Sequence, residues 1–213
     1  MKTLFKVMIA LVAVGVLAVL IVRSAQNSVA QPFTIAQQDL TGWTLTLAPD
    51  VDALDSLLSL TPKATFLPPL SRELFARMGE SLHYPTAAMP IVLRSEFERA
   101  MAGTLTSEAL LNAARDAGLE AATLQPQCMA RRRISSPGLI REVFFLVFEL
   151  PAFSQFREQV AQRLRAAGRD QSLFDPLALS PVLFAADLDG SFSRWLPLRA
   201  DQASDCFAPV VVQ

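Results

Sequence analysis

The single histidine of the chain, His83, would have to serve any Ser-His-Asp or Cys-His catalytic arrangement. Ser81 lies two residues away, but the sequence contains no Gly-x-Ser-x-Gly elbow that would expose a nucleophilic serine. A loop histidine followed by Tyr84 and Pro85 more often packs and forms hydrogen bonds. The sequence therefore predicts no catalytic residue and favours a non-enzymatic role. The alternative is an exported hydrolase that uses His83 or a pair of carboxylates, which carries no short signature.

Two aspartates, Asp187 and Asp189, flank a predicted hairpin tip and could share a cation with backbone carbonyls. A calcium loop needs more oxygen ligands at fixed spacing and a distal glutamate, and these are absent. Aspartates are also common turn formers, which explains both residues. Two separated cysteines and one histidine are too few ligands for zinc. We therefore expect no metal and no cofactor.

The densest charge in the sequence is a run of three arginines, Arg131, Arg132 and Arg133. On a strand, successive side chains alternate, so Arg131 and Arg133 point one way and Arg132 the other. Arg141, on the next predicted strand, could join them in a modest face that contacts an anion or a partner, such as lipid headgroups or an acidic protein. The alternative is a solvated strand end that pairs with Glu142 and Glu120.

The two cysteines, Cys128 and Cys206, are most simply a disulfide if the chain is exported. Closing so long a loop would stabilise the domain by about 4 kcal/mol in the chain-entropy treatment. The alternatives are two buried free thiols or a reactive Cys206.

The chain begins with an apolar run, residues 7–22, that carries no charge and no hydrogen-bonding side chain. In hydrocarbon such a run must be helical, and at about 1.5 Å per residue it reaches about 24 Å of a core about 30 Å thick. Thr3 to Lys6 close the gap, because a lysine stem can lie along the apolar zone. The run therefore predicts a transmembrane anchor.

A cleaved signal is the alternative to the anchor, with small residues Ser28, Val29 and Ala30 before the cleavage point. Lys2 and Lys6 precede the run, so the positive-inside bias leaves the amino terminus in the cytoplasm and the rest outside. We expect a single-pass membrane protein with an extracytoplasmic C-terminal domain, or a secreted or periplasmic protein after cleavage.

The charge and hydrophobicity of the chain limit the kinds of partner that this domain could bind. The net charge is −1, too mild for nucleic-acid binding, which needs a basic face. Hydrophobic residues make up 52% of the chain, and surplus apolar surface often marks a partner site. The leading hypothesis is an interaction or assembly module that binds an envelope protein or itself. A further alternative is an envelope carrier of a small ligand or lipid.

The first half of the domain reads as mostly helical. Residues 42–47 alternate as a strand, and residues 51–58 predict a short helix. An extended proline-rich connector, residues 61–70, leads to a helix over residues 71–78. Thr106 is expected to cap a helix over residues 107–117. Ser95 and Glu98 read as a capping box.

In the second half of the domain the apolar residues recur at every second position, which is typical of strands. Residues 119–134 and 139–150 predict paired strands, with Arg133 opposite Glu142 so that Arg132 avoids Arg141. Apolar residues from 153 to 164 then recur at helical spacing, with Arg157, Glu158, Arg163 and Arg165 expected to face outward. Residues 182–186 and 192–198 predict a hairpin, and residues 206–212 a last strand that Pro209 places at an edge.

Together these elements predict an α+β fold: an N-terminal transmembrane helix, then a mainly antiparallel sheet with helices packed on one face. A ferredoxin-like sandwich is one arrangement of that order. The expected division is an anchor or signal over 1–25, an irregular tether over 26–40 and an extracytoplasmic domain over 41–213. The domain has a helical part, 50–118, and a sheet-rich part, 119–213.

Overall fold

The computed structural model describes residues 15, 17, 31–48, 55–79, 82–84, 87–136, 139–188, 190 and 199–213, with only the backbone at 134–136, 139–141 and 171. Among these residues no helix is long and apolar enough to cross a bilayer. The expected anchor, residues 7–22, lies outside the description except for two positions, and the expected strand 192–198 lies outside it entirely.

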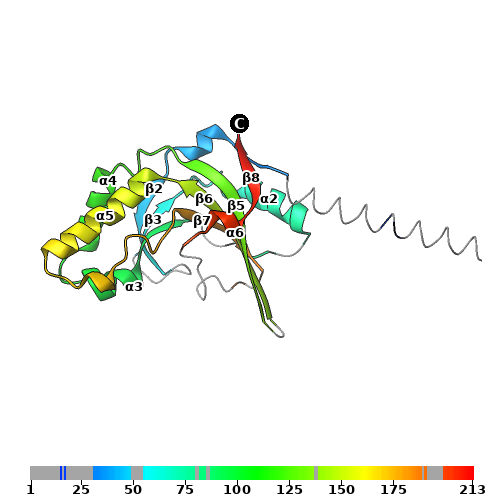
Figure 1. Ribbon diagram of the computed structural model, residues 1–213. Coiled ribbons are helices and arrows are strands. Elements are labelled where there is room, and N and C mark those ends of the chain that lie inside the picture. Colours follow the sequence, from blue (N-terminus) through cyan, green and yellow to red (C-terminus); the bar gives the residue numbers. More distant parts are fainter. Residues whose placement is uncertain are drawn as a thin grey trace, which may run out of the picture.

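The described chain has a mixed α+β fold built on two β-sheets (Figure 1). The larger sheet has the order β1-β8-β5-β6-β7 and is antiparallel except for the parallel pair β1–β8. Its strands are β1 (Phe33–Ile35), β5 (Gln125–Ser136), β6 (Leu139–Glu149), β7 (Val182–Asp187) and β8 (Cys206–Val212). The smaller antiparallel sheet contains β2 (Thr44–Leu47), β3 (Ser56–Thr61) and β4 (Met89–Leu93).

Helices connect the strands. They are α2 (Leu67–Met78), α3 (Arg94–Glu96), α4 (Ser107–Asp116), α5 (Pro151–Ala166) and α6 (Gln202–Asp205), with a π-helical turn η2 (Phe97–Met101) and 3-10 turns η1 (Gln37–Leu40) and η3 (Gln171–Leu173). The expected cap of α4 is confirmed, since Thr106 Oγ1 accepts a hydrogen bond from Ala109 N at 3.1 Å. The expected capping box is wrong in register: Glu96, not Glu98, accepts from the backbone N–H of Leu93 at 3.1 Å.

Strand β6 is buried on both faces, as its uninterrupted apolar sequence predicts. One face carries Phe144, Leu146 and Phe148 and belongs to the main core, which also holds the apolar residues of α2, α4 and α5. The other carries Val143, Phe145 and Val147 and packs in a smaller core with β5 and β7 residues. The expected hairpin register is confirmed, with Arg133 opposite Glu142.

The helix expected over residues 51–58 is wrong where the structure describes it. Residues from Ser56 onward form β3, which pairs with β2 on one side and β4 on the other. Leu57, Leu58 and Leu60 are all buried, so both faces of this strand are covered. A short apolar run buried on both faces cannot be told from a helix by periodicity alone.

Helix α2 begins at Leu67, four residues before the expected start, and replaces part of the extended connector. Pro68 and Pro69 lie in its first turn, where the missing N–H groups would have had no helical partner in any case. The helix ends as expected at Gly79, which adopts φ 66°.

Pro209 had suggested that β8 is an edge strand, and this expectation is wrong. Strand β8 lies between β1 and β5. Its ladder with β5 extends to Pro209, and its ladder with β1 begins at Val210, so the residue without an N–H lies where one partner replaces the other. Strand β1 and turn η1 fall within residues 26–40, which are therefore not wholly irregular.

The ferredoxin-like arrangement is not observed. That fold requires split β-α-β units, in which a helix joins two strands with another strand between them. Here α5 joins β6 directly to its antiparallel neighbour β7. The coarser expectation, an α+β fold with a mainly antiparallel sheet, is confirmed.

Candidate functional site: the base of the β5–β6 arm

The β5–β6 hairpin extends beyond the sheet to which it belongs (Figure 1). Strand β8 pairs with β5 only from Cys128 to Ala130, and β7 pairs with β6 only from Val143 to Val147. Within the described chain, residues 131–136 and 139–142 have no third strand beside them, although the Glu142 carbonyl at the base still accepts a hydrogen bond from Leu188 N at 3.0 Å. We call these residues the β-arm.

One face of the base of the β-arm carries Arg131. Its Nε lies 3.2 Å from Glu142 Oε1, and the Glu142 side chain is almost fully buried. The Arg131 guanidinium also lies 5.4 Å from the centre of the Phe207 ring, which packs against the main core. This face is therefore fixed by an ion pair and an aromatic contact.

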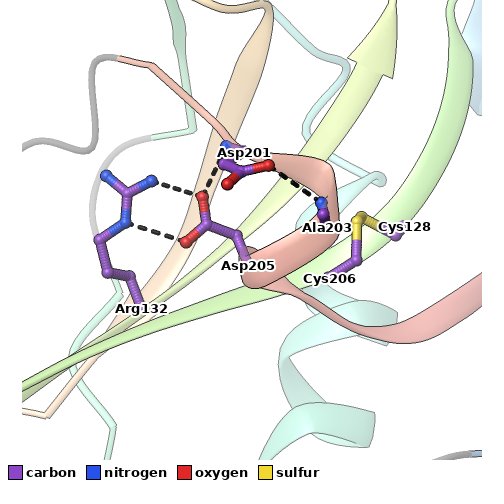
Figure 2. Close-up of a disulfide and its surroundings, with 6 residues drawn as sticks. All are labelled: Cys128, Arg132, Asp201, Ala203, Asp205 and Cys206. Carbon is purple, nitrogen blue, oxygen red and sulfur yellow. Dashed lines mark hydrogen bonds and ion pairs between the residues drawn. A yellow bond between two sulfur atoms is a disulfide. The ribbon is translucent and has the colours of Figure 1, made fainter.

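The opposite face carries Arg132, as the alternation predicted. Arg132 donates two hydrogen bonds to the Asp205 carboxylate: Nε donates to Oδ1 at 3.0 Å and Nη2 donates to Oδ2 (Figure 2). Nη2 also donates to the carbonyl of Arg199 at 2.9 Å. Asp205 Oδ2 additionally accepts from Asp201 N at 2.8 Å, so the carboxylate links Arg132 to the N-cap residue of α6.

The disulfide between Cys128 and Cys206 is confirmed (Figure 2). Cys206 directly follows Asp205, and the bridge joins the start of β8 to β5, with the two Cα atoms 5.7 Å apart. Because the bond fixes β8 against β5, it also holds Asp205 next to Arg132. The covalent link and the ion pair thus fasten the same base. Sequence reasoning missed Asp205, because its partner Arg132 lies far away along the chain.

The structure gives fewer contacts for the other two arginines, Arg133 and Arg141. Arg133 is exposed and forms no hydrogen bond or ion pair with the described residues. The side chain of Arg141 lies outside the description, although its backbone is on β6. Glu120 is not part of this cluster, since it pairs with Arg115 at 3.3 Å and accepts from Leu45 N. Contact of the four arginines with an anion or partner remains a prediction.

His83 and Asp187 lie together, though they are distant in sequence. Their backbones exchange two hydrogen bonds, at 2.8 and 2.9 Å. The buried Asp187 carboxylate accepts from Gly190 N at 2.8 Å, which is how a turn-forming aspartate acts. His83 is exposed, and Asp189 lies outside the described chain. Across the described residues, no three or more His, Cys, Asp or Glu side chains form a potential metal cluster.

The expectation that Arg157 faces outward is wrong, because its side chain is fully buried. All five of its N–H groups are used: two reach Glu96 Oε1 and Oε2, at 2.7 and 3.2 Å, and three reach backbone carbonyls. Those carbonyls belong to Ile91, Asp175 and Pro176. The spacing did contain the signal, since 157 falls between 153, 156, 160 and 164 on the inward stripe of the helix.

No protein-family model matches the chain, and no significant match was found among curated proteins or among solved structures.

Proposed function

We propose that this protein is a membrane-anchored extracytoplasmic module that binds an envelope partner, either another protein or a second copy of itself, through the β-arm. The apolar run of residues 7–22 supports the anchor. The disulfide supports an oxidising compartment, because such bonds persist outside the reducing cytosol.

The observation that carries the proposal is that most of the β-arm pairs with no third strand among the described residues. A two-stranded ribbon is marginally stable by itself in water, and its free edges present N–H and C=O groups that can pair with another chain. Here the base of the ribbon is held by a disulfide and two arginine–carboxylate pairs. A fastened base with open edges suits strand addition by a partner.

Charge on the β-arm indicates the chemistry of that partner. Arg131 and Arg132 are balanced by carboxylates within the chain, whereas Arg133 is exposed without such a partner among the described residues. Arg141 adds a second positive charge on the neighbouring strand. Complementary charge steers association and fixes register, so we expect an acidic segment on the partner.

Site-specific photo-crosslinking in intact cells tests the proposal. A photoreactive residue in place of Arg133 should capture a defined partner, whereas the same residue in place of Leu177, which is 63% exposed, should not. The captured species would be identified by mass spectrometry, which separates self-association from a second protein. Equal capture from both positions, or a strictly monomeric protein with no captured species, would count against the proposal.

A shortened β-arm gives the matched control for stability. Replacing residues 134–141 by Asn-Gly joins Arg133 to Glu142 through a two-residue turn that favours hairpins. The base keeps its ion pairs and disulfide, so the thermal unfolding temperature should change little while the crosslinked partner is lost. Undiminished capture by the shortened protein would show that the β-arm is not the binding element.

A further inference from the structure

Helix α2 presents a large aromatic side chain to solvent. The helix buries Leu70 and Leu74, while Phe75 on its outer side is 53% exposed. Arg72, Phe75 and Ala76 are all exposed and lie on one stripe, at the three- and four-residue spacing of neighbours on a helix surface. A single exposed phenylalanine needs no explanation, so the surroundings of this one decide its meaning.

A second aromatic residue lies against the same helix. Tyr84 is 43% exposed, and its hydroxyl donates to the carbonyl of Ser71 at 3.2 Å, one helical turn before Phe75. Tyrosine is enriched at the boundary between bilayer and water, and helices that lie in this boundary combine phenylalanine on one side with arginine or lysine on the other. We call Arg72, Phe75, Ala76 and Tyr84 the α2 outer face.

Helix α2 contacts the segment that connects the domain to the apolar run of residues 7–22. Arg77, near the end of α2, donates to the backbone carbonyls of Gln31 and Pro32. Its guanidinium also lies 3.9 Å from the centre of the Phe33 ring in β1. Helix α2 is therefore fastened to the first described residues of the domain, and it packs beside β1 (Figure 1).

Chain length then limits where the domain can sit. Even fully extended at ~3.3–3.6 Å per residue, the segment between Val22 and Gln31 spans at most about 30 Å. A domain of this length has a radius of gyration of about 16 Å, so its opposite sides lie about 30–40 Å apart. An anchor in residues 7–22 therefore keeps Gln31, and with it the adjoining end of α2, within about 30 Å of the bilayer, which excludes the orientation with this side farthest from the membrane.

We infer that the α2 outer face rests in the headgroup layer of the membrane that holds the anchor. Phe75 and Tyr84 insert their rings at the interface, and Arg72 contacts lipid phosphate. This inference rests on the proposed anchor and adds a second, lipid-binding surface distinct from the β-arm.

Spin labelling of the full-length protein in vesicles of phosphatidylcholine and phosphatidylglycerol tests it. Both native cysteines are in the disulfide, so an introduced cysteine is the single free thiol. A nitroxide at Ala76→Cys should be severalfold more accessible to oxygen, relative to a water-soluble nickel complex, than one at Leu177→Cys. Adding Phe75→Ser to Ala76→Cys should shift the label toward water, and adding Phe75→Trp should not.

The outcomes separate the two proposals. A protein released by alkaline carbonate has no anchor, which overturns the proposed function and this inference together. A carbonate-resistant protein whose label at position 76 is as water-accessible as the label at position 177 overturns this inference alone. A label at position 76 that is shielded from both oxygen and nickel indicates a protein contact, and also overturns it. Circular dichroism of each labelled variant confirms that it is folded.

Discussion

Two arginine–carboxylate pairs in this protein use the same chemistry in different surroundings. Arg157 and Arg132 each grip a carboxylate with two N–H groups, donate to a backbone carbonyl and lie near a phenylalanine ring. The Arg157 side chain is 0% exposed, and that of Arg132 is 29% exposed. Burial, rather than partner geometry, is the main difference between them.

This difference separates a role in the fold from a role in positioning a site. Arg157 joins α5 to the β4–α3 junction and to residues 175–176, so it connects the helical and sheet-rich parts of the domain. A buried pair broken on one side leaves an uncompensated charge in a low-dielectric interior. Arg132, reached by solvent, instead fixes Asp205 and β8 against the base of the β-arm.

The largest effect is expected from Arg157→Ala, because Glu96 would remain buried without its cation. The free energy of unfolding should fall by about 3–5 kcal/mol, measured by urea denaturation. Arg165→Ala on the same helix is the control, since its pair with Glu158 is exposed and should be worth under about 1 kcal/mol. Similar losses for the two variants would remove the distinction between the buried and the exposed pairs.

The next effect is expected from the disulfide. Replacing both Cys128 and Cys206 by serine frees a loop with a sequence separation of 78 and should lower the unfolding free energy by about 2–4 kcal/mol. Thiol reductant should destabilise the wild-type protein by a similar amount and leave the serine variant unchanged. A serine variant as stable as the oxidised wild type would contradict this prediction.

A smaller effect is expected at Arg132. A double-mutant cycle with Arg132→Gln and Asp205→Asn should give a coupling energy of about 1–2 kcal/mol, because solvent weakens a partly exposed pair. The equivalent cycle on Arg157 and Glu96 should give a clearly larger coupling. Equal coupling in the two cycles would mean that exposure does not distinguish these sites.

The smallest effect concerns Asp170, an exposed carboxylate that begins η3, the turn leading to the carbonyls that bind Arg157. Its hydrogen bonds from Ser172, chiefly from the backbone N–H, lower the pKa of the carboxyl below 3.8. The ionised form is therefore favoured by folding, and its contribution is present above pH 3.8 and is lost as the pH falls through the lowered pKa.

Comparison of wild type with Asp170→Asn isolates this contribution. The wild type should be slightly more stable at pH 6, and the difference should narrow as urea denaturation is repeated toward pH 3. A difference that is constant over this range would show that ionisation of Asp170 does not support the turn.

Local patterning was sufficient for the elements whose partners are near in sequence. The strands of the β-arm flank one turn, so avoiding Arg132 opposite Arg141 was enough to select the observed register. Thr106 caps α4 through atoms three residues away. The disulfide pairing could be predicted from the number of cysteines, because two cysteines allow one intramolecular pairing.

Other features were decided only when distant segments met. The burial of Arg157 depends on Glu96 and on carbonyls from two other segments, which together satisfy every N–H that burial removes from water. The interior place of β8 depends on β1, a strand of three residues from the other end of the domain. Sequence therefore determined the register of the β5–β6 hairpin, the cap of α4 and the covalent bridge. Tertiary structure decided whether the apolar run of β3 became a strand or a helix, and which polar groups could be buried, because both depend on partners that no local pattern contains.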